Sequence, residues 1–344
     1  METFLNIDYP TWWFLVVGAV FSGYAVLDGF DFGAGAWHLF FKKEQSRRVA
    51  LNAIGPVWDG NEVWLVIGGG TLFAGFPVVY ATMLSGMYIP FMLFLMFIIL
   101  RAISIEFRSK EEMLWWRKMW DITYSVSSIM LALLLGIVLG NVLQGFPLME
   151  DKELSVSLLQ VLNPFSLLVG ATTLALFMMH GAIYLTMKTE GRLFAKLTIL
   201  LKKAIIAFVV LFAITTLYTL IYLPHLSDRF KESPVFFIVP LMAILSIANI
   251  PRLTTKRKYF QAFLFSALAI CLLFIIVAIE LYPVILFSTI DPQNHITIYD
   301  AASSTKTLKI MLTFAAIGVP LIASYTFFVY RTFRGVVKLE KTSY

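Results

Sequence analysis

One uncharged segment places the strongest limit on what this chain can fold into. Residues 63–100 contain no Asp, Glu, Lys, Arg or His over 38 positions. As a single α-helix, this segment would be about 57 Å long, nearly twice the hydrocarbon thickness of a bilayer. Gly75, Phe76 and Pro77 interrupt it near its middle. The segment therefore predicts two membrane-spanning helices joined by a tight hairpin.

Similar apolar segments recur along the whole chain of 344 residues. Hydrophobic residues make up 59% of it and charged residues only 14%, against about 25% charged residues in a soluble domain. The sequence therefore predicts an all-α integral membrane protein with nine transmembrane helices. The predicted spans cover residues of about 12–40, 54–74, 78–100, 122–143, 164–187, 204–223, 235–250, 260–282 and 308–330.

The distribution of basic residues tests this count. With nine spans, 22 of the 27 Lys and Arg residues fall on one side of the membrane and 5 on the other. Cytoplasmic loops are enriched in Lys and Arg, so we expect the N-terminus outside and the C-terminus in the cytoplasm. The net charge of +6 is thus a sign of membrane topology, and we expect no nucleic-acid partner.

Four carboxylates interrupt the first two apolar helices. Asp28 and Asp31 lie three residues apart in the first span, and Asp59 and Glu62 have the same spacing in the second. Each pair therefore shares one face of its helix. A carboxylate in hydrocarbon costs roughly 3 kcal/mol on insertion scales, so these groups must face protein or water. Such residues mark a functional pathway by default.

Charged residues at the cytoplasmic end of the third span extend this predicted cluster: Arg101, Glu106 and Arg108. Two interpretations remain open. The carboxylates could form a proton-conducting pocket open to the cytoplasm, or a structural network in which the arginines neutralise them and hold the first three helices together. Glycines in the first span would allow helices to approach closely beside the acids.

The histidines limit redox chemistry in this chain. His38 falls at a predicted cytoplasmic helix end, and His225 and His295 at external helix ends or loops. His180 alone lies mid-span; it is either a satisfied polar core residue or a haem or proton-relay residue. No histidine pair has metal-ligand spacing, and Cys271 is the single cysteine. We therefore expect no catalytic, cofactor-binding or metal-binding residues in this chain alone.

Several motifs together resemble subunit II of the cytochrome bd-type quinol oxidases. They extend in order over nearly the whole chain. The motifs are Gly-Tyr-Ala-Val-Leu-Asp-Gly-Phe-Asp-Phe-Gly at 23–33, Trp-Asp-Gly-Asn-Glu-Val-Trp at 58–64, the run at 101–110, Asn-Val-Leu-Gln-Gly at 141–145, Leu-Asn-Pro-Phe at 162–165 and Asp-Ala-Ala-Ser-Ser at 300–304.

The resemblance implies two four-helix bundles plus one peripheral helix. On this pattern, residues 1–150 form the first bundle with the proton-path candidates, 151–290 the second bundle, and 291–344 the last span and a cytoplasmic tail. It also implies a homologous subunit I that holds haem b and haem d, oxidises quinol and reduces oxygen to water. The resemblance attributes a proton path to Asp28, Asp31 and Asp59, with Glu62 beside them.

The resemblance also predicts the setting of the protein. It implies the cytoplasmic membrane of a bacterium or archaeon, as part of the aerobic respiratory chain. Ubiquinol or menaquinol as substrate, a small single-span subunit, and a structural lipid or quinone all stay open. The alternative function is a stand-alone secondary transporter that uses the carboxylates for proton coupling.

Overall fold

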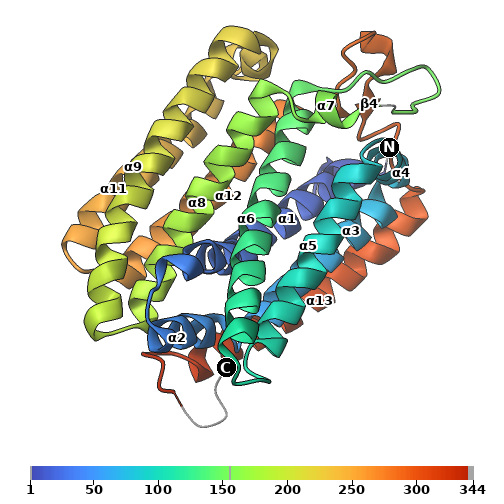
Figure 1. Cartoon of the computed structure of the whole chain (residues 1–344). Coiled ribbons are helices and arrows are strands. Elements are labelled where there is room, and N and C mark those ends of the chain that lie inside the picture. Colours follow the sequence, from blue (N-terminus) through green and yellow to red (C-terminus); the bar gives the residue numbers. More distant parts are fainter. Residues whose placement is uncertain (1, 155, 340–344) are drawn as a thin grey trace.

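A computed structural model describes residues 2–154 and 156–339 as a set of long helices that run side by side (Figure 1). The helices are α1 (Tyr9–Trp37), α2 (Glu44–Ile54), α3 (Trp58–Gly75), α4 (Pro77–Gly86), α5 (Tyr88–Phe107), α6 (Leu114–Gln144), α7 (Leu158–Val161), α8 (Pro164–Lys188), α9 (Gly191–Tyr222), α10 (Asp228–Glu232), α11 (Ile238–Thr255), α12 (Tyr259–Leu281) and α13 (Thr305–Thr332). Short 3₁₀ helices cover His38–Phe40, Pro224–Ser227, Pro234–Phe237 and Pro292–Asn294. The strands β1 (Thr3–Phe4) and β2 (Ile7–Asp8) form one antiparallel pair, and β3 (Val284–Leu286) and β4 (Ile296–Thr297) form another.

The prediction of an all-α protein with nine spans is confirmed for the described residues. Among the described residues, eight helices are long and apolar enough to cross a membrane, and the count is nine when the pair α3 and α4 is taken as one span. This pair is broken by a bend of 118°. The prediction succeeded because a spanning helix needs an apolar segment long enough to cross about 30 Å of hydrocarbon, and such segments are visible in the sequence.

Several predicted boundaries were wrong. The fourth span begins at Leu114 rather than residue 122, and the sixth at Gly191 rather than residue 204. The third span begins at Tyr88 rather than residue 78, because Pro77–Gly86 forms the separate helix α4 after the bend. The seventh span does not stop at Pro251 but continues to Thr255. The hydroxyls of Thr254 and Thr255 donate hydrogen bonds to the carbonyl of Pro251. Pro251 lacks an N–H for the carbonyl of Ile247, so the helix continues with one backbone hydrogen bond missing, as membrane helices tolerate.

The spans divide into two groups around α1 and α8. The helices α1, α3, α5 and α6 pack as one group, and α8, α9, α11 and α12 pack as the other. Helix α13 runs along the outside, and Leu308 is its only buried residue. The predicted arrangement of two four-helix bundles plus one peripheral helix is therefore confirmed.

Glycines allow the two groups to meet closely. A β-carbon added to Gly33 of α1 would collide with the backbone carbonyl of Phe177 in α8. A β-carbon on Gly181 of α8 would lie 2.7 Å from the backbone of Phe30 and Ala34. Small residues permit such backbone contact between membrane helices. Helix α1 is therefore buried over its second half, from Asp28 to Trp37.

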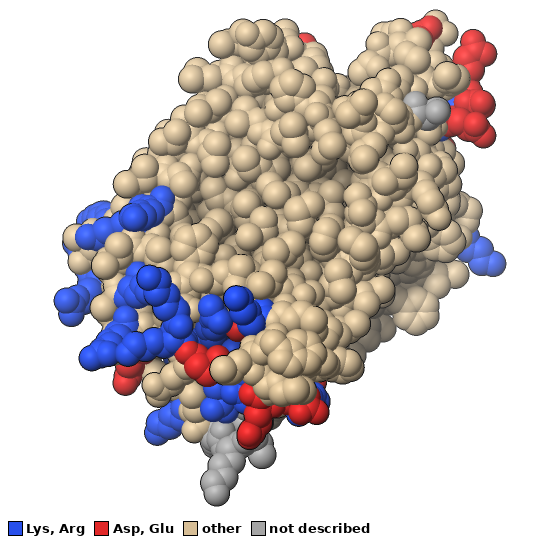
Figure 2. Space-filling view, viewed as in Figure 1, with Lys and Arg blue, Asp and Glu red and all other residues tan. Residues whose placement is uncertain are grey.

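The two ends of the molecule differ in charge. Lys and Arg side chains gather at the end where the C-terminus lies, and we call this the basic end (Figure 2). Helix α2 lies at the basic end, whereas α7 and the β3–β4 pair lie at the opposite end with the N-terminus (Figure 1).

Candidate functional site

An ion pair between α1 and α5 forms the centre of the candidate site. The guanidinium of Arg101 donates from Nη2 to Oδ1 of Asp28 at 2.7 Å and from Nη1 to Oδ2 at 3.1 Å. Both side chains are 0% exposed. The guanidinium also lies 4.4 Å from the centre of the Phe32 ring. This two-pronged geometry is the one that compensates buried charge best.

Glu62 connects this ion pair to the outside of the helix group. Its Oε1 atom lies 3.3 Å from Nη1 of Arg101, within ion-pair distance but without hydrogen-bond geometry. The Glu62 side chain is 16% exposed, whereas Arg101 is 0% exposed. One arginine is therefore shared between a fully buried carboxylate and a partly accessible one.

Asp31 occupies a different environment, one turn further along α1. Its Oδ2 accepts a hydrogen bond of 2.7 Å from Nδ2 of Asn61, and its Oδ1 has no hydrogen-bond partner. Within residues 2–154 and 156–339, Asp31 forms no ion pair. The hydroxyl of Tyr330 in α13 donates to Oδ1 of Asn61 at 3.2 Å. A buried carboxyl group of this kind is a candidate for holding and releasing a proton.

Asp59 lies outside this buried group. It is exposed in the first turn of α3, where the helix dipole favours a negative charge. Because Glu62 follows three residues later on the same face, the acids of α3 lead from the exposed helix start toward Arg101. The accessibility of the charged groups thus falls in the order Asp59, Glu62 and Asp28.

A second charge cluster, which we call the Asp121 cluster, joins four helical segments at the basic end: the 3₁₀ helix at His38–Phe40, α2, the C-terminal end of α5, and α6. Oδ1 of Asp121 accepts from Nε of Arg108 at 2.6 Å, and Oδ2 accepts from Nη1 of Arg47 at 2.8 Å. Nε2 of His38 forms a short hydrogen bond to the same carboxylate. Arg108 also bonds to Glu44 at 2.9 Å. Burial disfavours the charge of Arg108, but its bonds to Asp121 and Glu44 outweigh burial and raise its pKa.

The structure therefore divides the seven predicted site residues. It brings Asp28, Glu62 and Arg101 into contact and places Asp31 beside Asn61. Arg108 belongs to the Asp121 cluster instead, and Glu106 is half-buried on α5.

The sequence interpretation missed the contributions of Asn61, Tyr330 and the Asp121 cluster. His38 was assigned only to a cytoplasmic helix end, and the structure shows it fully buried there against Asp121. A signal for it existed, because His38 directly follows α1 and is seven residues, or two helical turns, after Asp31, which points it to the same side as Asp31. No comparable signal linked Tyr330 to Asn61, since these residues are 269 positions apart.

His180 is a fully bonded core residue. Its Nε2 donates to the carbonyl of Val26 at 3.1 Å, which leaves Nδ1 to pair with the hydroxyl of Ser266 at 2.6 Å. The ring stacks on Phe263 with 4.6 Å between ring centres. A haem ligand needs a free ring nitrogen and space for the macrocycle. His180 therefore does not fit the role of an axial haem ligand.

The described part of the chain contains no group of three His, Cys, Asp or Glu residues with the geometry to hold a metal ion. Each buried charge in the two clusters instead finds its partners among protein groups. What the candidate site offers chemically is a set of carboxyl groups and hydrogen-bond donors. Such groups can stabilise the helix packing or transfer protons.

Comparison with known proteins identifies the family. The family model for cytochrome bd terminal oxidase subunit II matches residues 9–333, a range that includes both charge clusters and all the spans. The chain belongs to this family. The subunit II family includes the cytochrome bd-I ubiquinol oxidase subunit 2 of Escherichia coli K12, which is 32% identical over 97% of each chain. It also includes the cytochrome bd ubiquinol oxidase subunit 2 of Bacillus subtilis, 32% identical over 94% of this chain and 95% of that one.

The fold of the subunit II family is also found in a solved structure. The bd oxidase of Geobacillus thermodenitrificans contains a chain that superposes with a TM-score of 0.80, at 19% identity, over 94% of this chain and 98% of that one. The resemblance stated from the motifs is therefore confirmed, and the fold of this multi-pass membrane protein is that of its family.

Proposed function

We propose that this chain is the haem-free subunit II of a bd-type quinol:oxygen oxidoreductase, a terminal oxidase of aerobic respiration. The observation that carries this proposal is the family match over residues 9–333. The partner would be a subunit I that holds haem b and haem d and uses electrons from quinol to reduce oxygen to water. The bonded state of both ring nitrogens of His180 supports a haem-free role for this chain.

The carboxylates of α1 and α3 form our proposed proton path. Protons would enter at the exposed Asp59, pass Glu62, and reach the buried groups Asp28 and Asp31. The support is the fall in accessibility along this series and the unpartnered Oδ1 atom of Asp31. Arg101 would set the charge of the path, because it neutralises Asp28 and contacts Glu62.

The orientation of the chain follows from its charge. We propose that the basic end faces the cytoplasm, since cytoplasmic loops are enriched in Lys and Arg. The C-terminus would then be cytoplasmic, the N-terminus external, and the path would open to cytoplasmic protons. We place the complex in the bacterial cytoplasmic membrane, because the relatives named above come from bacteria.

The remaining parts of the proposal concern the division of the chain into two helix bundles and the partners of the protein. We assign residues 1–150 to the first bundle, 151–290 to the second, and 291–344 to the last span and tail. The Asp121 cluster would lock the cytoplasmic ends of the first bundle rather than conduct, because each of its charges is paired. A small single-span subunit and a bound lipid or quinone are further proposed partners.

The test of the proton path is an Asp59→Asn variant of the oxidase purified with its partner subunit. We expect oxygen-reduction turnover to fall at least tenfold while the haem absorption spectrum and the yield of complex stay unchanged. Glu112→Gln is the matched control, since Glu112 is an exposed carboxylate at the same end of the molecule. Equal turnover in wild type and Asp59→Asn would contradict the path.

The proposed identity is tested by the purification itself. A tagged chain should co-purify with a haem-rich partner and with quinol oxidase activity. A colourless chain that transports a solute by itself would support the stand-alone transporter instead, which the family match disfavours.

A further inference from the structure

A groove runs along the surface between α11 and α12. It consists of two adjoining cavities of about 390 Å³ and 480 Å³. They share Asn249, Arg252 and Phe265 and so form one continuous depression. Helices α11 and α12 are antiparallel neighbours that belong to the second bundle, and no residue that lines the groove comes from α1 or α3.

The two ends of this groove differ in chemistry. The end near the α11–α12 turn is lined by Arg252, Lys256 and Lys258, all of which are exposed. The other end is lined by apolar side chains, among them Leu245 and Leu268. The groove therefore suits a molecule with a charged head and a long apolar tail.

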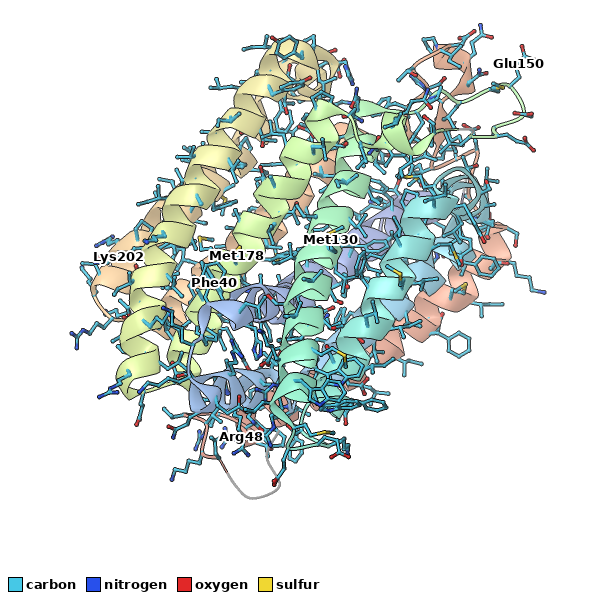
Figure 3. All side chains as sticks on the ribbon, viewed as in Figure 1. Phe40, Arg48, Met130, Glu150, Met178 and Lys202 are labelled. Atoms are coloured by element: carbon cyan, nitrogen blue, oxygen red, sulfur yellow. The ribbon has the colours of Figure 1, made fainter. Side chains whose placement is uncertain are left out.

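The positive charge of the groove is not compensated by this chain. Residues 233–279 contain no Asp or Glu, but they contain four basic residues, all between positions 252 and 258. In the part of the chain that the structure describes, none of these four forms an ion pair. Exposed Lys202 and Lys203 of α9 add charge at the same edge, where Lys202 projects from the helix (Figure 3).

We propose that this groove binds one anionic phospholipid of the cytoplasmic leaflet. The phosphate would contact Arg252, Lys256 and Lys258, and an acyl chain would lie along the apolar part of the groove. The Arg252 guanidinium suits phosphate oxygens because it can donate two parallel hydrogen bonds. Basic pockets between membrane helices on the cytoplasmic side bind such headgroups. The proposal rests on the orientation proposed above.

Charge favours a phospholipid over the other apolar molecules of a membrane. A quinone has an uncharged head and would leave the basic residues uncompensated. A phosphocholine lipid brings its own cation beside the phosphate, which the positive groove repels. An anionic headgroup such as phosphatidylglycerol supplies negative charge and no cation.

The test measures lipid binding to the purified complex directly. Native mass spectrometry would follow titration with phosphatidylglycerol and, separately, with phosphatidylcholine. We expect one phosphatidylglycerol to bind at least about tenfold more tightly than phosphatidylcholine. The triple variant Arg252→Gln, Lys256→Gln, Lys258→Gln should lose this preference. Equal binding of the two lipids to wild type would overturn the proposal.

A matched triple variant controls for the loss of three charges. Lys42→Gln, Lys43→Gln, Lys110→Gln removes three exposed basic residues elsewhere at the basic end. It should bind phosphatidylglycerol as tightly as wild type does. If both triple variants lose binding equally, the attraction is that of the whole surface, and the groove is not a site.

The apolar part of the groove is tested by filling it. Ala248→Trp should weaken phosphatidylglycerol binding at least about fivefold, because Ala248 lines the groove and is exposed. Ala316→Trp on the exposed face of α13 is the control and should have no effect. Full competition by millimolar inorganic phosphate, with no effect of Ala248→Trp, would indicate a simple anion site and overturn the lipid proposal.

Discussion

Arg101 of α5 and Asp28 of α1 form a two-pronged ion pair from which solvent is fully excluded. The Nη2–Oδ1 distance is 2.7 Å, and both side chains are 0% exposed. The attraction in such a pair only offsets the loss of hydration of the two charges, so the pair itself adds little net stability. The pair instead constrains substitution at both positions, because removal of either residue leaves the other as an unpaired charge in the protein interior.

The first prediction concerns this constraint. Asp28→Asn leaves the Arg101 guanidinium with only Glu62 as a charged partner, and we expect a loss of about 3–5 kcal/mol in the free energy of unfolding. The double variant Asp28→Asn, Arg101→Met should lose clearly less than the sum of the single variants, because no charge remains unpaired. Thermal unfolding of the detergent-solubilised complex measures both. Additive losses would mean that the two residues are not coupled.

The second prediction concerns the support of Asp31. Asn61→Ala removes the only hydrogen-bond donor to the Asp31 carboxyl group within the described residues. We expect a stability loss of about 1–3 kcal/mol together with reduced oxidase turnover, while the haem spectrum stays intact. Tyr330→Phe removes only the bond from α13 to Asn61 and should cost about 1 kcal/mol or less. A larger effect for Tyr330→Phe would show that α13, rather than α3, positions the site.

The third prediction concerns the contact between α1 and α8. Gly33→Ala places a methyl group against the carbonyl of Phe177 and should destabilise the fold by at least about 1–3 kcal/mol, because the helices must move apart. Gly18→Ala is the matched control in the same helix. It meets no atom within 4 Å and should leave stability unchanged or slightly raised. The measurement is the unfolding temperature of each variant. Equal unfolding temperatures for Gly33→Ala and Gly18→Ala would contradict the role of close packing between α1 and α8.

The fourth prediction concerns pH at the end opposite to the basic end. Nδ1 of His295 accepts a hydrogen bond of 2.9 Å from the backbone N–H of Ser288, so the bond requires a neutral ring nitrogen. Burial lowers the pKa of His295, and Asp291 opposes this only partly. The folded state therefore prefers neutral His295, and the unfolded chain binds the proton more readily. This contribution to stability is present above about pH 6.5 and is lost as the pH falls through the lowered pKa.

Unfolding between pH 5 and pH 8 measures this effect. The His295→Gln variant should show a smaller loss of stability at low pH than wild type shows. His225 is the other histidine beside Phe287, and burial also lowers the pKa of His225. The His225→Gln variant removes that second histidine, so the pH dependence that remains in it includes the contribution of His295 alone from this pair. An unchanged pH dependence in His295→Gln would contradict the prediction.

The sequence by itself determined the class, the number of spans and the family of this protein. The thickness of a bilayer sets the length of an apolar helix, so the uncharged segments could be counted directly. The helical repeat also placed Asp28 with Asp31, and Asp59 with Glu62, on shared faces. Boundaries were less accurate: the break at Gly75–Pro77 was predicted, but the separate helix Pro77–Gly86 before the third span and the continuation of α11 through Pro251 were not.

Only the tertiary structure decided which partner each charge takes. Arg101 lies in α5 and Arg108 caps its C-terminal end; they are seven residues apart and point to the same side, yet about 10 Å along the helix axis separates them. At one depth Arg101 meets Asp28 from α1, and at the other Arg108 meets Asp121 from α6. Periodicity determines the direction of a side chain but not the neighbour at its depth. That neighbour depends on how far each helix is displaced along its axis, which the packing of α1 against α3, α6 and α8 determines.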